Sequence, residues 1–186
     1  MSDTRKYILE HSGFSHNSLG GVKLYHQGKQ TDDLKPEMVY NKKNKIYEFY
    51  PGYYFTPDRR LAQAQAGADG NIVAVRLHLG EEVKGKPIRQ EVERLLLHAT
   101  KPNYVEQFGG IDEAISEYVG ERDRAKSYFY LYQSNYRGDY EAFFKVMSSF
   151  GYSHATTEEF NRTSGDFVVV FDPYSFTVVD VEDVKV

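Results

Sequence analysis

The chain has 186 residues, of which 40% are hydrophobic and 27% charged, and its formal net charge at pH 7 is -4. This length and composition predict a single folded domain over residues 1–186 and exclude a largely disordered chain. The charge forms no basic field of the kind that binds a nucleic-acid backbone, so nucleic acid is not indicated as a partner. No apolar run approaches the roughly 18 residues of a membrane span, and no signal peptide is evident. We therefore expect no membrane association and a cytoplasmic location, in the producing cell or in a host cell.

The chain contains no cysteine. It therefore has no disulfide framework, no thiolate nucleophile and no zinc-thiolate site. His11 and His16 lie in one turn-rich stretch, but no acidic or thiolate cluster accompanies them, so we expect no metal site. The motifs G-x-x-x-x-G-K, G-x-G-x-x-G, H-E-x-x-H and G-x-S-x-G are missing as well. Any chemistry must come from other residue patterns.

Two strands are predicted in the first 50 residues. Apolar and polar side chains alternate in VKLYHQGK (residues 22–29), which places Leu24 and His26 on the same face of a strand. The aromatic stretch KIYEFY (residues 45–50) predicts the second strand. Residues 29–45 are polar and rich in lysine, so we expect a loop between the two strands.

A short helix is predicted after the aromatic stretch YYF. Thr56 can cap its first turn, Pro57 fits the first helical position, and Asp58 complements the positive end of the helix dipole. We expect the helix to run over about 57–66 and to end at Gly67.

Three further strands are predicted, over residues 72–79, 165–172 and 175–184, because their sequences are rich in β-branched and aromatic residues. The first of them alternates between two expected faces. The apolar face carries Val73, Val75, Leu77 and Leu79, and the other face carries Ala74, Arg76 and His78.

Residues 81–150 change to helical spacing. Three helical stretches are expected over residues 88–99, 110–134 and 139–150, with turns at residues 101–103, 109–110 and 137–139. Strands at both ends of the chain with helices between them predict the α+β class.

Three short stretches occur in a characteristic order: KLYHQGK (23–29), PGYYFTPDRRLAQAQA (51–66) and SGDFVVVFDPYSFTVV (164–179). Together they resemble the ADP-ribosyltransferase superfamily, in particular its H-Y-E branch, which includes diphtheria toxin and the poly(ADP-ribose) polymerases. The first resembles a strand ending in aromatic-His-Gly, the second a Gly-x-Tyr-Phe strand followed by a short helix, and the third a strand that opens with an acidic residue. The resemblance implies an ADP-ribosyltransferase-like split, mostly antiparallel β-sheet core, with residues 81 to about 150 as a helical insertion.

The resemblance also implies a reaction, in which NAD is a substrate and its bond between nicotinamide and ribose is broken. ADP-ribose then passes to an acceptor. Breaking this bond builds positive charge on the ribose, so catalysis requires a fixed carboxylate near the 2'-hydroxyl and aromatic walls that hold a flat ring. No metal is needed.

For the adenosine half of NAD, the resemblance implies that His26 bonds the ribose. The residue after this histidine is often glycine in the family, whereas here Gln27 intervenes and the glycine comes as Gly28. The backbone of Gln27 can still supply an N–H and a C=O to the nicotinamide amide. The structural alternative for His26 is a histidine with satisfied hydrogen bonds on an apolar strand face.

For the nicotinamide half, the resemblance implies that Tyr54 stacks on the ring, and Tyr53 is the neighbouring candidate. Consecutive strand residues point to opposite faces, so only one of the two can face NAD, and the position of Gly52 favours Tyr54. Tyr53 and Phe55 are then expected in the core. We expect Gly52 to leave room for a flat ligand close to the backbone. The alternative for Tyr54 is ordinary core packing.

Three acidic residues are candidates for the catalytic carboxylate. Asp166 matches the position of the family's glutamate, directly before FVVVFD, although its side chain is shorter by one methylene. Glu159 and Glu158 lie just upstream and rank second and third. The alternatives are a solvated turn for the two glutamates and a strand start for Asp166. Ser164 stands where arginine-modifying members often carry a second acidic residue, which disfavours arginine as the modified side chain if Asp166 is catalytic.

The sequence therefore predicts an NAD-dependent mono-ADP-ribosyltransferase that modifies a protein acceptor. By analogy, a compact domain of this kind resembles a bacterial or phage effector or toxin. Transfer to water (a glycohydrolase) or to nucleic acid is one alternative. A catalytically inactive domain that binds a partner through its helical insertion is another.

Overall fold

The computed structural model describes residues 24–28, 36, 38–41, 46–49, 51–56, 59–60, 62, 71–121, 123–156 and 168–183. These residues form a mixed α+β structure, which confirms the predicted class. Within them, no helix is both long and apolar enough to span a membrane.

The elements follow the chain in the order strands, helices, strands. The strands are β1 (Leu24–Gly28), β2 (Met38–Asn41), β3 (Ile46–Phe49), β4 (Tyr53–Phe55), β5 (Asn71–Leu77), β6 (Glu81–Glu82), β7 (Tyr152–Thr156), β8 (Val168–Val170) and β9 (Phe176–Asp183). The helices are α3 (Arg89–Leu97), α4 (Tyr104–Phe108), α5 (Ile111–Gly120), α6 (Arg124–Asn135) and α7 (Tyr140–Ser149), with a 3-10 turn, η1 (Pro173–Ser175), before β9.

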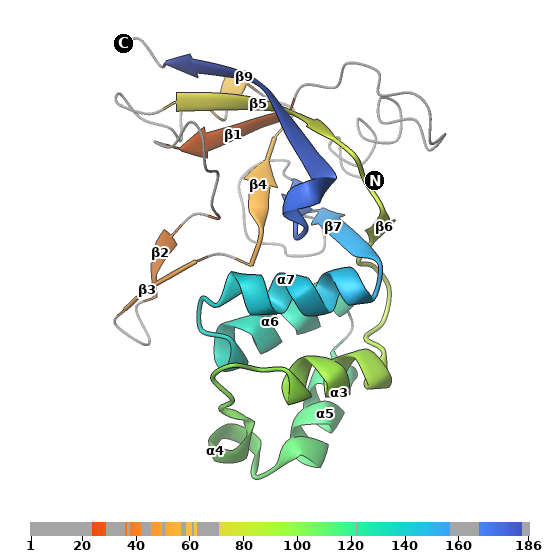
Figure 1. Ribbon diagram of the computed structural model, residues 1–186. Helices are drawn as coiled ribbons and strands as arrows, with labels where there is room; N and C mark the ends of the chain where they lie inside the picture. Colours follow the sequence, from red (N-terminus) through yellow and green to blue (C-terminus); the bar gives the residue numbers. More distant parts are fainter. Residues whose placement is uncertain are drawn as a thin grey trace.

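The strands are divided between two main sheets and a hairpin (Figure 1). One sheet has the antiparallel order β1-β5-β9, and the other has the order β4-β8-β7-β6. In the second sheet only β6 and β7 are parallel. A parallel pair needs a long connection, and here the five helices supply it. We call this group, residues 89–149, the helical insertion.

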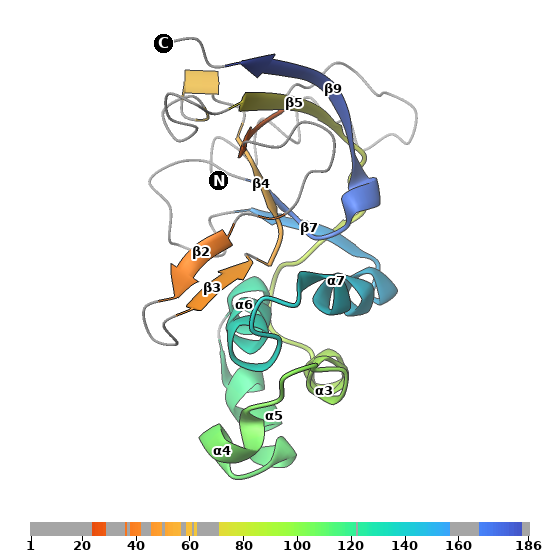
Figure 2. The ribbon, with the colours of Figure 1, turned by 60° about the vertical axis from the view of Figure 1, so that its left-hand side comes forward.

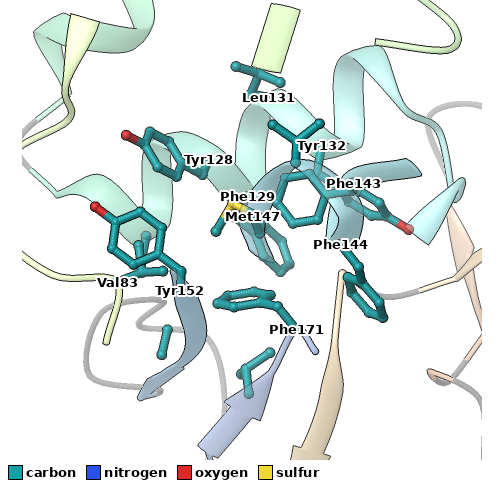
Figure 3. Packing of buried hydrophobic residues seen from close by; sticks show 14 of the residues in the cluster. Val83, Tyr128, Phe129, Leu131, Tyr132, Phe143, Phe144, Met147, Tyr152 and Phe171 are labelled. Atoms are coloured by element: carbon teal, nitrogen blue, oxygen red, sulfur yellow. The ribbon is translucent and has the colours of Figure 1, made fainter. Parts of the chain in front are cut away.

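The helical insertion lies at one end of the molecule, below the strands in Figures 1 and 2. Its core is aromatic, with Tyr128, Tyr132 and Phe143 at most 2% exposed. The ring of Phe143 in α7 lies 6.1 Å from that of Phe171, which follows β8 (Figure 3). The insertion and the β4-β8-β7-β6 sheet therefore share one hydrophobic core rather than two separate ones.

The predicted helical stretch 110–134 is divided into two helices, α5 and α6. The reason is Asp123, whose side-chain carboxylate accepts a hydrogen bond of 2.8 Å from the backbone N–H of Lys126. This N-cap begins a new helix. The spacing of apolar residues alone does not show the boundary between this helix and the preceding one. The turn predicted at 109–110 is confirmed, because Gly109 ends α4 in the left-handed conformation.

The loop expected over residues 29–45 is wrong in part, because this range contains β2. Strand β2 pairs with β3 in an antiparallel hairpin, with Val39 opposite Glu48 and Tyr40 opposite Tyr47. Polarity hid the strand, because the lysines at residues 42–45 fall in the connection and dominate the composition of the range. Both views show this hairpin apart from the β1-β5-β9 sheet.

Strand β5 confirms the prediction for 72–79 in position but not in its two faces. Ile72 and Ala74 are 1% exposed, as buried as Val73 and Val75. The central strand of a sheet can be covered on both faces, and its sequence then loses the simple inward and outward alternation.

Strand β7 was not predicted, because its sequence YSHAT is polar. All five residues are buried. Ser153 Oγ accepts a hydrogen bond from the backbone N–H of Gly80 at 2.8 Å and lies 2.9 Å from Nδ1 of His154. Internal hydrogen bonds therefore accompany the burial of Ser153 and His154, whereas Oγ1 of Thr156 is buried without a hydrogen-bond partner among the described residues.

The helix predicted over 57–66 falls largely outside the described residues. Arg59, Arg60 and Ala62 are described and are helical.

Candidate functional site

The candidates of the first stretch lie on β1: His26 for the adenosine ribose, the backbone of Gln27 for the nicotinamide amide, and Gly28 after it. This strand is an outer strand of its three-stranded sheet and pairs only with β5 in the described part of the chain, with His26 opposite Val73. The structure thus places the three residues at the edge of the β1-β5-β9 sheet.

The candidates for stacking on the nicotinamide ring lie on β4, where burial alternates along the strand. Tyr53 is 4% exposed and Phe55 is fully buried, whereas Tyr54 between them is half-buried. Tyr53 packs against Phe144 of α7 and Phe176 of β9, with ring centroids 5.9 Å and 4.9 Å away. The expected core positions of Tyr53 and Phe55 are confirmed, and Tyr53 is thereby enclosed among aromatic rings rather than placed on the face of Tyr54.

The three stretches of the family pattern come together at β4. Strand β4 pairs with β8, with Tyr54 directly opposite Val169, and β1 lies against β4. The second and third stretches are therefore neighbours in one sheet, and the first stretch meets them from the other sheet. Residues about 30 and 110 positions apart in the sequence become adjacent in this way.

The three acidic candidates, Asp166, Glu159 and Glu158, lie outside the described residues. All three belong to the segment that connects β7, which ends at Thr156, to β8, which begins at Val168. In the sequence Asp166 comes just before β8, the strand that pairs with β4, whereas Glu158 and Glu159 come just after β7, the strand on the other side of β8.

Gly52, directly before β4, has a different role from the expected one. A Cβ atom on Gly52 would lie 2.5 Å from Cγ1 of Val169 and 2.9 Å from the carbonyl oxygen of Val170. The space is filled by β8 rather than left open for a ligand, so the expected role of Gly52 is wrong. Gly52 lets the chain approach β8 closely, two residues before Tyr54.

A polar cluster that the sequence did not predict joins the helical insertion to the sheet. It consists of Glu91 on α3, Arg124 and Tyr128 on α6, and Tyr152 on β7. The Tyr152 hydroxyl lies 3.1 Å and 3.2 Å from the two carboxylate oxygens of Glu91, and the Tyr128 hydroxyl donates to the same carboxylate. Arg124 donates from Nη1 to the Tyr152 hydroxyl and from Nε to the carbonyl of Lys86 at 2.8 Å.

The environment of the polar cluster raises the pKa values of its two tyrosines. Burial, together with the charge and hydrogen bond of Glu91, raises the pKa of Tyr128 far above its ordinary value. Burial and the Glu91 charge raise the pKa of Tyr152 to about 12, against the opposing effect of Arg124. Both hydroxyls thus stay protonated at neutral pH and serve as hydrogen-bond donors. Because the donors and acceptors of the polar cluster bond one another, the arrangement joins elements rather than presenting a reactive group.

Within the described part of the chain, no group of three histidine, aspartate or glutamate side chains is placed so that it could hold a metal ion.

Gly52→Ala is expected to lower the free energy of unfolding by about 1–3 kcal/mol, because the added methyl group overlaps Val169 and the β8 backbone. Urea unfolding followed by circular dichroism measures the change. The matched control is Gly120→Ala, since a Cβ atom on Gly120 meets nothing within 4 Å and this glycine ends α5. The control should be neutral or stabilising by up to about 1 kcal/mol. Equal stability of both variants would contradict the close approach at Gly52.

Alkaline pH is expected to destabilise the protein, and Tyr152→Phe to weaken that dependence. The pKa of Tyr152 is about 12 in the folded protein against 10.0 for an unperturbed tyrosine, so between these values the unfolded state loses a proton that the folded state keeps. The stabilisation is complete below pH 10 and is lost as the pH rises to 12. Urea unfolding at a series of pH values measures the slope.

Part of the slope should remain in Tyr152→Phe, because Tyr118, Tyr128 and Tyr136 also have pKa values raised by burial. Tyr174→Phe is the control, since the Tyr174 side chain is 89% exposed, and its slope should equal that of the wild type. An unchanged slope in Tyr152→Phe would mean that Tyr152 ionises alike in the folded and unfolded states.

Comparison of the chain with protein-family models, with curated proteins and with solved structures gave no match. A proposal for its function therefore rests on the residues and the geometry of this chain.

Proposed function

We propose that the chain is an NAD-dependent mono-ADP-ribosyltransferase that modifies a protein acceptor. The observation that carries the proposal is the position of β4, which pairs with β8 and lies against β1. The three stretches that resemble the superfamily are thus brought to one place, although they are far apart in sequence. Short motifs that match by chance are not expected to lie next to one another in the fold.

Each half of NAD has a candidate contact in this arrangement. Tyr54 offers a half-buried aromatic ring next to buried Val169, a surface suited to stacking on the flat nicotinamide. His26, on the neighbouring strand β1, is the candidate for the adenosine ribose. The backbone of Gln27, also on β1, is the candidate for the nicotinamide amide, so the two sheets would hold the dinucleotide together.

The proposed reaction is a substitution at the ribose carbon that bears nicotinamide. That carbon–nitrogen bond breaks, its electron pair leaves with nicotinamide, and a nucleophilic atom of the acceptor forms the new bond and gives up a proton. The carboxylate, for which Asp166 ranks before Glu159 and Glu158, would stabilise the positive charge that develops on the ribose. Tyr54 and His26 would orient NAD so that this charge develops next to the carboxylate.

The test is incubation of the protein with NAD labelled in its adenosine half, together with a cell lysate. We expect label on protein. Tyr54→Ala should lower kcat/KM for NAD about tenfold or more, because stacking on a heterocyclic ring is worth about 1–3 kcal/mol. Tyr54→Phe keeps the ring and should retain most of the activity. The matched control for the truncation is Tyr174→Ala, at a side chain that is 89% exposed.

The carboxylate is identified by the three amide variants Asp166→Asn, Glu159→Gln and Glu158→Gln. We expect Asp166→Asn to lower kcat by about 100-fold or more, as the loss of an electrostatic contact to the transition state does. The other two variants should stay near the wild type. A loss confined to Glu159→Gln or Glu158→Gln would move the role to that residue.

Other distributions of the label identify the rival functions. Free ADP-ribose without labelled macromolecules would indicate a glycohydrolase, and label on nucleic acid would indicate a different acceptor. Absence of NAD binding by calorimetry, with no label transferred, would contradict the proposal and leave a catalytically inactive binding domain.

A further inference from the structure

One aromatic side chain connects the two main sheets. Phe176 begins β9 and stands opposite Leu77 of β5, so its backbone belongs to the β1-β5-β9 sheet. Its ring contacts the other sheet, with centroids 4.9 Å from that of Tyr53 and 5.0 Å from that of Phe55. Both contacts are edge-to-face, at interplanar angles of 64° and 63°.

These two contacts hold β4 in position relative to the β1-β5-β9 sheet. Edge-to-face rings at this separation attract one another beyond simple area burial. Tyr53 and Phe55 are 4% and 0% exposed, so the packing around them is dense and has little room to rearrange. Tyr54 lies between Tyr53 and Phe55 in the strand, so its position depends on the contacts that Phe176 makes with these two residues.

We propose that Phe176 is a positioning residue for NAD, which sets the spacing between the two sheets that together hold the dinucleotide. The inference rests on the proposed function, because His26 and Gln27 lie on β1 and Tyr54 on β4. A ligand that spans both sheets binds tightly only if the contacts on the two sheets are already at the right distance. ADP, which lacks nicotinamide and its ribose, reaches only His26 on β1 and gains nothing from that distance.

Binding of NAD and of ADP therefore separates positioning from simple structural support. Calorimetry gives the Kd values of NAD and of ADP for the wild type and Phe176→Ala. We expect Phe176→Ala to weaken NAD binding about tenfold or more, through the lost preorganisation. The Kd of ADP should change by less than about twofold, since its proposed contact lies on β1 alone. Phe176→Leu restores apolar volume and should recover part of the NAD affinity.

The matched control is Phe108→Ala in the helical insertion. Phe108 is also half-buried and also makes an edge-to-face contact, with Tyr118, at a centroid distance of 5.5 Å and an angle of 77°. Phe108→Ala removes a comparable ring contact but no contact with β4. NAD affinity should stay within about twofold of the wild type, even if the free energy of unfolding falls as much as in Phe176→Ala.

Three results would overturn the inference. Unchanged NAD affinity in Phe176→Ala would show that the spacing does not depend on this ring. Equal weakening of NAD and of ADP would show that the site has collapsed and that Phe176 is only structural. Both of these leave the proposed function standing. Failure of the wild type to bind NAD would remove the proposed function, and the inference with it.

Discussion

The aromatic packing around β4 is the interaction on which the rest of the structure depends. Tyr53 and Phe55 point into the core, where Phe176 contacts both and Phe144 contacts Tyr53. Phe144 belongs to the helical insertion and Phe176 to the β1-β5-β9 sheet. The three-residue strand β4 thus joins the two sheets and the helices. Strands and helices that follow one another in the chain therefore pack as one unit.

The helical insertion is part of this unit rather than an appendage. Its aromatic residues pack on the chain just after β8, and the polar cluster ties α3 and α6 to β7 through the carboxylate of Glu91. Removing Glu91 would leave the buried Tyr128 side chain without the carboxylate to which its hydroxyl donates, which is costly. The insertion is therefore expected to help hold β8, and through β8 the strand that carries Tyr54, in place.

The extent to which the sequence predicted this structure differs from element to element. The α+β class and the alternation of Tyr53, Tyr54 and Phe55 were predicted, because burial at period two is a local property of a strand. Strand β2 was missed because the lysines that follow it dominate the composition of its range, and β7 because hydrogen bonds of Ser153 and His154 offset its polar composition. The polar cluster was beyond prediction, because Glu91 and Tyr152 are 61 positions apart.

The sequence by itself determined which residue types were present, the α+β class, the alternation along β4, and the order of the three family-like stretches. These depend on local backbone and side-chain preferences. Only the tertiary structure decided that the three stretches meet at β4, that Gly52 serves a close approach of two strands, and that Phe176 connects the sheets. The physical reason is that such contacts arise from packing between segments distant in the chain, which no local preference encodes.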